Sequence, residues 1–461
     1  MGTRFGLGQK LAFSLGNGVE WFINSAFNLW VFTFYFAAVK LSIGYIMTAY
    51  ILWTVWNAFN DPLIGYLSDR THTRFGRRRI YIMIGFIPVL LLELLIWLPP
   101  VSGEMAQFFY LLIMLLLYDT AYTLIALPTD SLFPELYTSV EERTQVNTIR
   151  QIFAAVGLIL AALVPGFLIG ETDTRDGYFM NGIVTSVIVG ISLIIFLIWG
   201  AKEREEFKLD YQQNFSLIKG LGYAFRNIGF VLYIIMFFLY EFILLLLATI
   251  VPLFGVHILH TDTLGFISSS LAVSLLMGLL YIVGIAFMYV WKKLDIKLGS
   301  RIGYGISMIL YFAASIPMLF ISSFWYAIIV VVFMGIGFGG MLYFIWYIVA
   351  DVIDDDELKT GVRREGIFFG ISNFFMRLSM ILSILIVGTV FIQTGWDEYN
   401  PIPGVNVIFG LRFLFVIVPG IALGISLVCL YFFPFTKKKV LEMKVKLNEL
   451  HQQKMDKVKS V

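Results

Sequence analysis

About twelve apolar segments, each long enough to cross a bilayer, run through this chain of 461 residues. A membrane-spanning helix needs about 20 mostly apolar residues. Helices satisfy all of their backbone hydrogen bonds internally, as lipid requires. The pattern therefore predicts an all-α polytopic membrane protein. The expected spans are 11–38, 44–67, 80–100, 106–130, 146–170, 180–200, 226–256, 264–292, 303–321, 324–350, 366–393 and 407–434.

Composition and motifs limit the possible functions. The chain is 59% hydrophobic and 14% charged, whereas soluble domains carry roughly 25% charged residues. It has no G-x-S-x-G, P-loop or H-E-x-x-H motif. We therefore expect no enzyme activity, no metal site and no cofactor. Energy for uphill movement of a substrate would come from an ion gradient, and embedded carboxylates suit cation coupling.

The longest polar connection, Ala201–Arg226, separates two groups of six expected spans. The Lys-rich C-terminal stretch is predicted to be a helix near anionic headgroups, or alternatively a solvated helical tail. We expect four parts: 1–200, an N-terminal six-helix bundle; 201–225, a cytoplasmic linker; 226–435, a C-terminal six-helix bundle; and 436–461, a cytoplasmic basic tail.

Basic residues gather on alternate connections between the spans, whereas the other connections hold little beyond Lys40 and Arg175. Because cytoplasmic loops are rich in Lys and Arg, these connections and both termini are expected to be cytoplasmic. The basic set is Arg70, Arg74, Arg77, Arg78, Arg79, Lys202, Arg204, Lys208, Lys292, Lys293, Lys297, Arg301, Lys359, Arg363 and Arg364.

The two groups of spans also repeat acidic and basic positions. Asp130 and Arg143 in the first group parallel Asp351 and Arg364 in the second, with an offset of 221 residues by subtraction in both cases. The arrangement of two six-helix halves resembles that of the major facilitator superfamily, in which the substrate site lies between the halves. The alternative is that any polytopic protein has basic loops on alternate connections.

Polar side chains lie inside several expected spans, where they need a cavity or a neighbouring helix. In the first span they recur at helical spacing and share one face. Structural roles compete with functional ones: Asp61 could brace the neighbouring basic turn, Asn24 could bond a neighbouring helix, and Arg150 could pair with Asp119 or Asp61. The polar positions are Asn17, Glu20, Trp21, Asn24, Asn28, Asn57, Asp61, Asp119, Tyr122, Asp130, Arg150, Trp346 and Arg377.

Two motifs carry a family resemblance. The first is Asn60-Asp61-Pro62-Leu63-Ile64-Gly65 with Arg74-Phe75-Gly76-Arg77-Arg78-Arg79, and the second is Ala350-Asp351-Val352-Ile353-Asp354 with Lys359-Thr360-Gly361. They resemble the signatures of the glycoside–pentoside–hexuronide:cation symporters. The resemblance implies alternating-access symport of a sugar, glycoside or uronide with H⁺ or Na⁺. A sister branch moves lysophospholipids.

The resemblance implies site residues, with departures. The cation carboxylate of the second helix corresponds to Asp61, but two further carboxylates of the family fall at Asn57 and Ala126. Asp119 and Asp130 are candidates to replace them. The sugar-binding Asp falls at Trp21. The missing carboxylates favour H⁺, because Na⁺ needs several oxygen ligands.

Three sets of residues follow from these patterns. The predicted sets are Asp61, Asn57, Asp119 and Asp130 for cation coupling; Glu20, Trp21, Asn24, Arg150, Tyr122, Trp346 and Arg377 for substrate; and Asp69, Arg77, Arg78, Asp351, Lys359 and Arg364 for gating.

We expect a multi-pass protein of the cell membrane that acts as a monomer. Its partners are a small-molecule substrate and the lipid bilayer, and no nucleic acid. The alternatives to a sugar symporter are a carrier of lysolipid or another amphiphile and, in another class, a non-transporting membrane scaffold or sensor.

Overall fold

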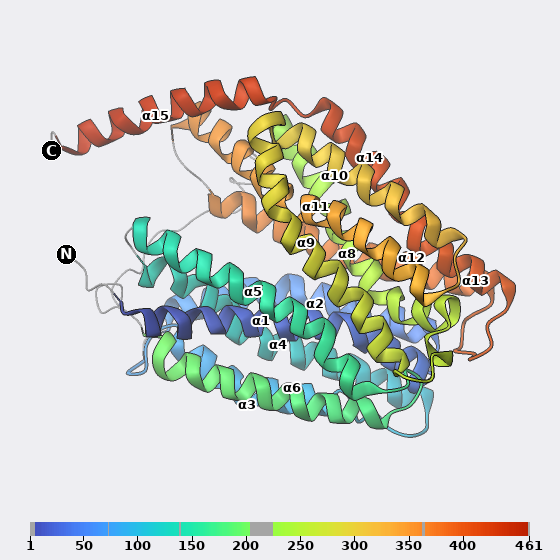
Figure 1. Cartoon of the computed structure of the whole chain (residues 1–461). Coiled ribbons are helices and arrows are strands. Elements are labelled where there is room, and N and C mark those ends of the chain that lie inside the picture. The colour runs from blue at the N-terminus through green and yellow to red at the C-terminus, as the bar shows by residue number, and fades with distance from the viewer. Residues whose placement is uncertain (1–4, 72, 138–139, 203–224, 362–364, 460–461) are drawn as a thin grey trace. The chain divides into compact units, whose positions relative to one another are not determined.

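The described residues of this protein form helices and no strand. The computed structural model describes residues 5–71, 73–137, 140–202, 225–361 and 365–459 (Figure 1). The helices are α1 (Leu7–Thr33), η1 (Phe34–Ala38), α2 (Ile43–Arg70), α3 (Arg79–Leu95), α4 (Glu104–Leu136), α5 (Val140–Ile169), α6 (Asp176–Ile195), η2 (Phe196–Gly200), α8 (Ile228–Leu259), η4 (Thr261–Thr263), α9 (Ser269–Leu298), α10 (Ser300–Ser315), η5 (Ile316–Leu319), α11 (Phe324–Thr360), α12 (Glu365–Thr394), α13 (Val405–Arg412), η6 (Phe413–Ile417), α14 (Val418–Phe432) and α15 (Lys437–Lys459).

Nine helices within the described residues are long and apolar enough to cross a membrane. The helices α1, α2 and α3 are not among the nine: α3 has 17 residues, and α1 and α2 carry many of the polar positions. The predicted all-α polytopic membrane fold is confirmed. The count of twelve spans stays a prediction.

The chain divides into two compact units. Unit 1 comprises Met1–Gln213, Ala248–Gly278 and Ile384–Leu411, and unit 2 comprises Asn214–Leu247, Leu279–Ser383 and Arg412–Val461. The predicted division into two bundles, a linker and a tail stays a prediction, and residues 203–224 of that linker lie outside the described residues.

In unit 1, α1 packs along α5, and α2 packs along α4. Two glycines allow the first pair to approach closely: a Cβ atom added to Gly157 would lie 2.2 Å from the carbonyl oxygen of Gly18. Small residues at such crossings bring membrane helices together. This close packing places polar side chains of α1, α4 and α5 within reach of one another.

In unit 2, α15 packs against the acidic end of α11. Met443 and Leu447 of α15 are buried. Lys444 is paired with Asp354, and the His451 Nε2 atom lies 2.9 Å from the Glu357 Oε1 atom. The C-terminal stretch is thus a helix that packs on its own unit through both apolar and charged contacts.

Candidate functional site

A cluster of polar side chains joins α2 to α4 inside unit 1. Asn57 donates a hydrogen bond to one carboxylate oxygen of Asp119, and the Asn60 Nδ2 atom donates to the other over 3.1 Å. Asn60 also donates to the Thr123 hydroxyl over 3.1 Å, and Thr123 donates to Asp61 over 3.0 Å. The structure therefore brings together three of the predicted coupling residues, Asn57, Asp61 and Asp119.

The cluster is deeply buried. Asn57, Asn60, Asp119 and Thr123 are each no more than 4% exposed. A buried polar group is costly unless it is hydrogen-bonded, and here two amide groups donate to one carboxylate. We name this set, with Asp61, the amide cluster. Its geometry suits a carboxylate that accepts hydrogen bonds and holds two helices in register.

A second cluster lies where α1, α4 and α5 meet. The Tyr122 hydroxyl donates to the Glu20 Oε1 atom over 3.4 Å, and the Arg150 Nη2 atom lies 2.6 Å from the Asp130 Oδ1 atom. The Asn17 side-chain amide lies 3.2 Å from the same guanidinium nitrogen. We name these five residues the arginine cluster. It contains Asp130 from the predicted coupling set and three residues from the predicted substrate set.

Arg150 pairs with Asp130, and not with Asp119 or Asp61 as considered from the sequence. The Arg150 side chain is 11% exposed and that of Asp130 is 55% exposed, so the pair runs from the interior toward the surface of the unit. The guanidinium carbon lies 4.6 Å from the ring centroid of Phe133. A cation held over an aromatic face gains a favourable interaction, so ring and carboxylate together hold the guanidinium.

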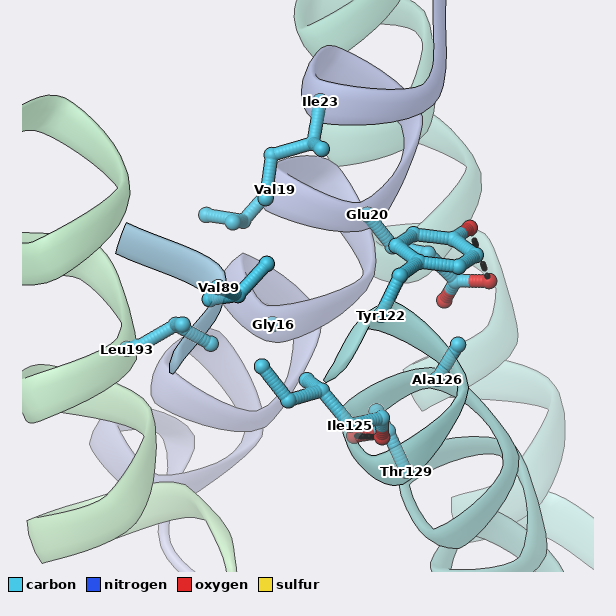
Figure 2. A pocket seen from close by; sticks show the side chains of 10 residues that line it. All are labelled: Gly16, Val19, Glu20, Ile23, Val89, Tyr122, Ile125, Ala126, Thr129 and Leu193. Atoms are coloured by element: carbon cyan, nitrogen blue, oxygen red, sulfur yellow. Dashed lines mark hydrogen bonds between the residues drawn. The ribbon is translucent and has the colours of Figure 1, made fainter. Parts of the chain in front are cut away.

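Glu20 and Tyr122 also line a small cavity, shown in Figure 2, with room for about one water molecule. The Tyr122 ring lies beside the carboxyl group, and its hydroxyl points toward that group. The remaining lining is largely apolar. It comprises Gly16, Val19 and Ile23 of α1, Val89 of α3, Ile125, Ala126 and Thr129 of α4, and Leu193 of α6.

The other predicted substrate residues lie outside both clusters. Trp21 is 44% exposed, and Asn24 is exposed and accepts a hydrogen bond from the Asn28 amide over 3.0 Å. In unit 2, Trp346 is also 44% exposed, next to Phe237. Arg377 is half-buried and interacts electrostatically with Glu241.

The predicted gating residues form contacts within their own units. Arg77 and Arg78 of the loop before α3 both pair with Glu135 of α4, over 2.6 and 2.7 Å. Lys359 pairs with Asp355 on α11 over 2.5 Å, and Asp351 is buried. Two predictions fall outside what the structure describes: the side chain of Asp69 and residue Arg364.

Sequence reasoning gave no role to four residues that complete these contacts. Asn60 and Thr123 link Asp119 to Asp61, Asn17 contacts Arg150, and Glu135 holds the basic turn. The sequence could have predicted the role of Asn60, because Asn60 lies three positions after Asn57 and therefore on the same helix face. Within the described residues, no group of three or more His, Cys, Asp or Glu could hold a metal ion.

Comparisons with known proteins cover nearly the whole chain. The profile of the family described as MFS/sugar transport protein matches residues 12–437. The isoprimeverose transporter of Lactiplantibacillus pentosus is 23% identical, over 93% of this chain and 89% of that protein. The sodium-dependent lysophosphatidylcholine symporter 1 of Xenopus tropicalis is 21% identical, over 97% of this chain and 91% of that protein.

Solved structures share the fold. The crystal structure of a D-xylose-proton symporter superposes with a TM-score of 0.67 at 14% identity, covering 94% of this chain and 98% of that chain. The crystal structure of the nucleoside transporter NupG superposes with a TM-score of 0.68 at 15% identity, covering 93% of this chain and 100% of that chain.

Proposed function

Because this chain belongs to the MFS/sugar transport protein family, we propose that it is a symporter that moves a sugar, glycoside or uronide together with a cation. Membership makes it a multi-pass membrane transporter with the major facilitator fold, and not an enzyme. Alternating access would expose one site first to one side of the membrane and then to the other. Isoprimeverose and xylose, in the names of two similar proteins, support the sugar class.

The observation that carries the proposal is the concentration of charge inside unit 1. Glu20, Asp119 and Asp130 lie on helices α1 and α4, close to Arg150 or to buried amides. Charged groups within membrane helices are expensive and mark ion or substrate pathways. We propose that cation and substrate act through the amide cluster and the arginine cluster, with Trp21, Asn24, Trp346 and Arg377 as further substrate contacts.

We propose H⁺ as the coupled cation. Sodium needs several oxygen ligands, whereas a proton needs one carboxyl group. In the amide cluster, both oxygens of Asp119 already accept hydrogen bonds from amides. Na⁺ is the alternative cation, because the lysophosphatidylcholine symporter that is similar to this chain is named as sodium-dependent.

The direct test is transport by the purified protein in liposomes. The probes are isoprimeverose, methyl β-D-glucuronide and lysophosphatidylcholine, each with an imposed proton gradient, an imposed sodium gradient or neither. We expect one of the two sugars to accumulate only with the proton gradient. Protein-free liposomes are the control. Accumulation driven by sodium alone would overturn the choice of proton, and an absence of sugar flux would overturn the sugar proposal.

An amphiphile carrier is the second candidate. It is supported by the lysophosphatidylcholine relative and by the largely apolar lining of the cavity beside Glu20. In the same assay it predicts lysophosphatidylcholine transfer without sugar flux. A scaffold or sensor predicts flux of none of the probes.

We also propose that both termini lie in the cytoplasm, in line with the basic connections. A protease added outside intact cells should then leave a tag at either end uncut. The expected monomer is checked by the mass of the purified protein in detergent.

A further inference from the structure

We propose that Glu20 is the group that carries the coupled proton, with Arg150 as a counter-charge shared between Glu20 and Asp130. The inference rests on the proposed function, because it assigns the proton of that symport to one residue. It takes Glu20 from the predicted substrate set and gives it a coupling role. Asp61, Asn57 and Asp119 then hold α2 against α4.

The Glu20 carboxyl group is only partly satisfied. Its Oε1 atom accepts the Tyr122 hydroxyl over a long distance of 3.4 Å, and its Oε2 atom is buried and accepts no hydrogen bond from any described residue. An ionised carboxylate without donors is costly inside a protein, much more so than a neutral carboxyl group. The geometry of this conformation therefore suits the protonated form.

Arg150 has the capacity to serve a second carboxylate. A guanidinium has five N–H donors in a fixed fork, and here Nη2 donates to Asp130 and also to Asn17 when the amide oxygen of Asn17 is turned toward it. The Nε atom of Arg150 is buried and donates to no acceptor in the part of the chain that the structure describes. Donor capacity is therefore left on the arginine near a carboxyl group whose Oε2 atom lacks a donor among the described residues.

One proton bound by Glu20 makes the arginine cluster electrically neutral. From the packed helices, Glu20 faces Tyr122 and Asp130 of α4 and Arg150 of α5, with the neutral Asn17 on its own helix. The side chains that α3 and α6 contribute to the cavity, Val89 and Leu193, are apolar. Two ionised carboxylates with one guanidinium would leave a net negative charge and an ionised Glu20 with a buried oxygen that lacks a described donor, and a proton on Glu20 removes both.

The coupling step follows from this balance. When the site opens to water, the O–H bond of Glu20 breaks and the proton passes to water. The Glu20 carboxylate then accepts hydrogen bonds from the guanidinium of Arg150. Asp130, whose side chain is 55% exposed, is left to be hydrated. The reverse exchange loads the next proton.

Infrared spectroscopy tests the proton site without any substrate. In acid-minus-base difference spectra of the full-length protein, Glu20→Gln should lose one carboxylic acid band. Glu93→Gln is the matched control and should keep the band that Glu20→Gln loses. Glu93 also has a buried Oε2 atom, but it lies beside Tyr118 and not Arg150. A Glu20→Gln spectrum identical to that of the wild type would overturn the assignment.

Transport then tests the coupling, with the sugar probe that the wild type accumulates. Glu20→Gln should exchange that sugar across the membrane yet accumulate it no further than equilibrium, whereas Glu93→Gln should accumulate it normally. Proton-driven accumulation by Glu20→Gln equal to that of the wild type would overturn the inference and leave the symport proposal standing. If the wild type moves neither sugar, the symport proposal fails and the spectroscopic result still decides the site.

If Glu20→Gln fails to fold, Glu20→Asp replaces it, because it keeps an ionisable carboxyl group. A carboxylic acid band displaced from its wild-type position would support Glu20 as the proton site, and an unchanged spectrum would overturn it.

Discussion

The amide cluster and the arginine cluster share helix α4 but solve the problem of a buried carboxylate in different ways. In the amide cluster, Asp119 receives hydrogen bonds from Asn57 and Asn60, which are neutral and fixed on one neighbouring helix. In the arginine cluster, one guanidinium lies near two carboxylates, and the buried Oε2 atom of Glu20 accepts no hydrogen bond from the described residues. The first arrangement favours one conformation, whereas the second allows exchange of a partner.

Removing the acceptor of the amide cluster should have the largest effect on stability. Asp119→Ala removes one hydrogen-bond acceptor from each of the buried amides of Asn57 and Asn60, and Asn60 keeps the Thr123 hydroxyl. Each such loss costs about 1–3 kcal/mol, so we expect the free energy of unfolding to fall by roughly 3 kcal/mol. Thermal melting of the purified protein in detergent measures the loss.

Asp119→Asn provides the comparison for this change, because it keeps one oxygen acceptor and removes the charge. We expect a melting temperature between those of Asp119→Ala and the wild type. A melting temperature of Asp119→Ala equal to that of the wild type would contradict the structural role of the amide cluster.

The exchange role of the arginine cluster predicts a smaller but functional effect. Arg150→Lys keeps the positive charge and removes the planar fork that could serve two carboxylates. We expect kcat/KM for the transported sugar to fall about tenfold, which corresponds to about 1.4 kcal/mol, with little change in melting temperature. Uptake rates in liposomes measure it, and an unchanged kcat/KM would show that charge alone suffices.

The apolar pattern predicted the helices well, because burial in lipid acts on each segment separately. The expected span 366–393 corresponds to α12 at Glu365–Thr394, and 226–256 to α8 at Ile228–Leu259. The expected span 407–434 corresponds to three consecutive elements, α13, η6 and α14, which run from Val405 to Phe432, because a π-helical turn interrupts the α-helix.

The ion-pair partner of Arg150 could not be predicted from the apolar pattern of the sequence. Asp119 and Asp130 are eleven residues apart by subtraction, close to three full turns, so both share one face of α4. Their positions along the axis of α4 are about 16 Å apart. The axial position of α5 relative to α4 decides which of the two Arg150 reaches. Helical periodicity determines the face of a helix on which a residue lies but not the axial position of a neighbouring helix. Asp119 and Asp61 were therefore plausible partners from the sequence, whereas Asp130 is the observed one.

The smallest predicted effect tests whether the two clusters are independent. Thr123 links Asn60 to Asp61 in the amide cluster, and it follows Tyr122 of the arginine cluster directly in α4. Thr123→Val keeps the shape and removes the hydroxyl, so the free energy of unfolding should fall by about 1 kcal/mol, measured by thermal melting. Proton-driven accumulation should be unchanged, because Glu20, Arg150 and Asp130 keep their contacts. Loss of that accumulation at full stability would mean that the hydrogen bonds of the amide cluster belong to the coupling step, and the division between a fixed and an exchanging carboxylate would fail.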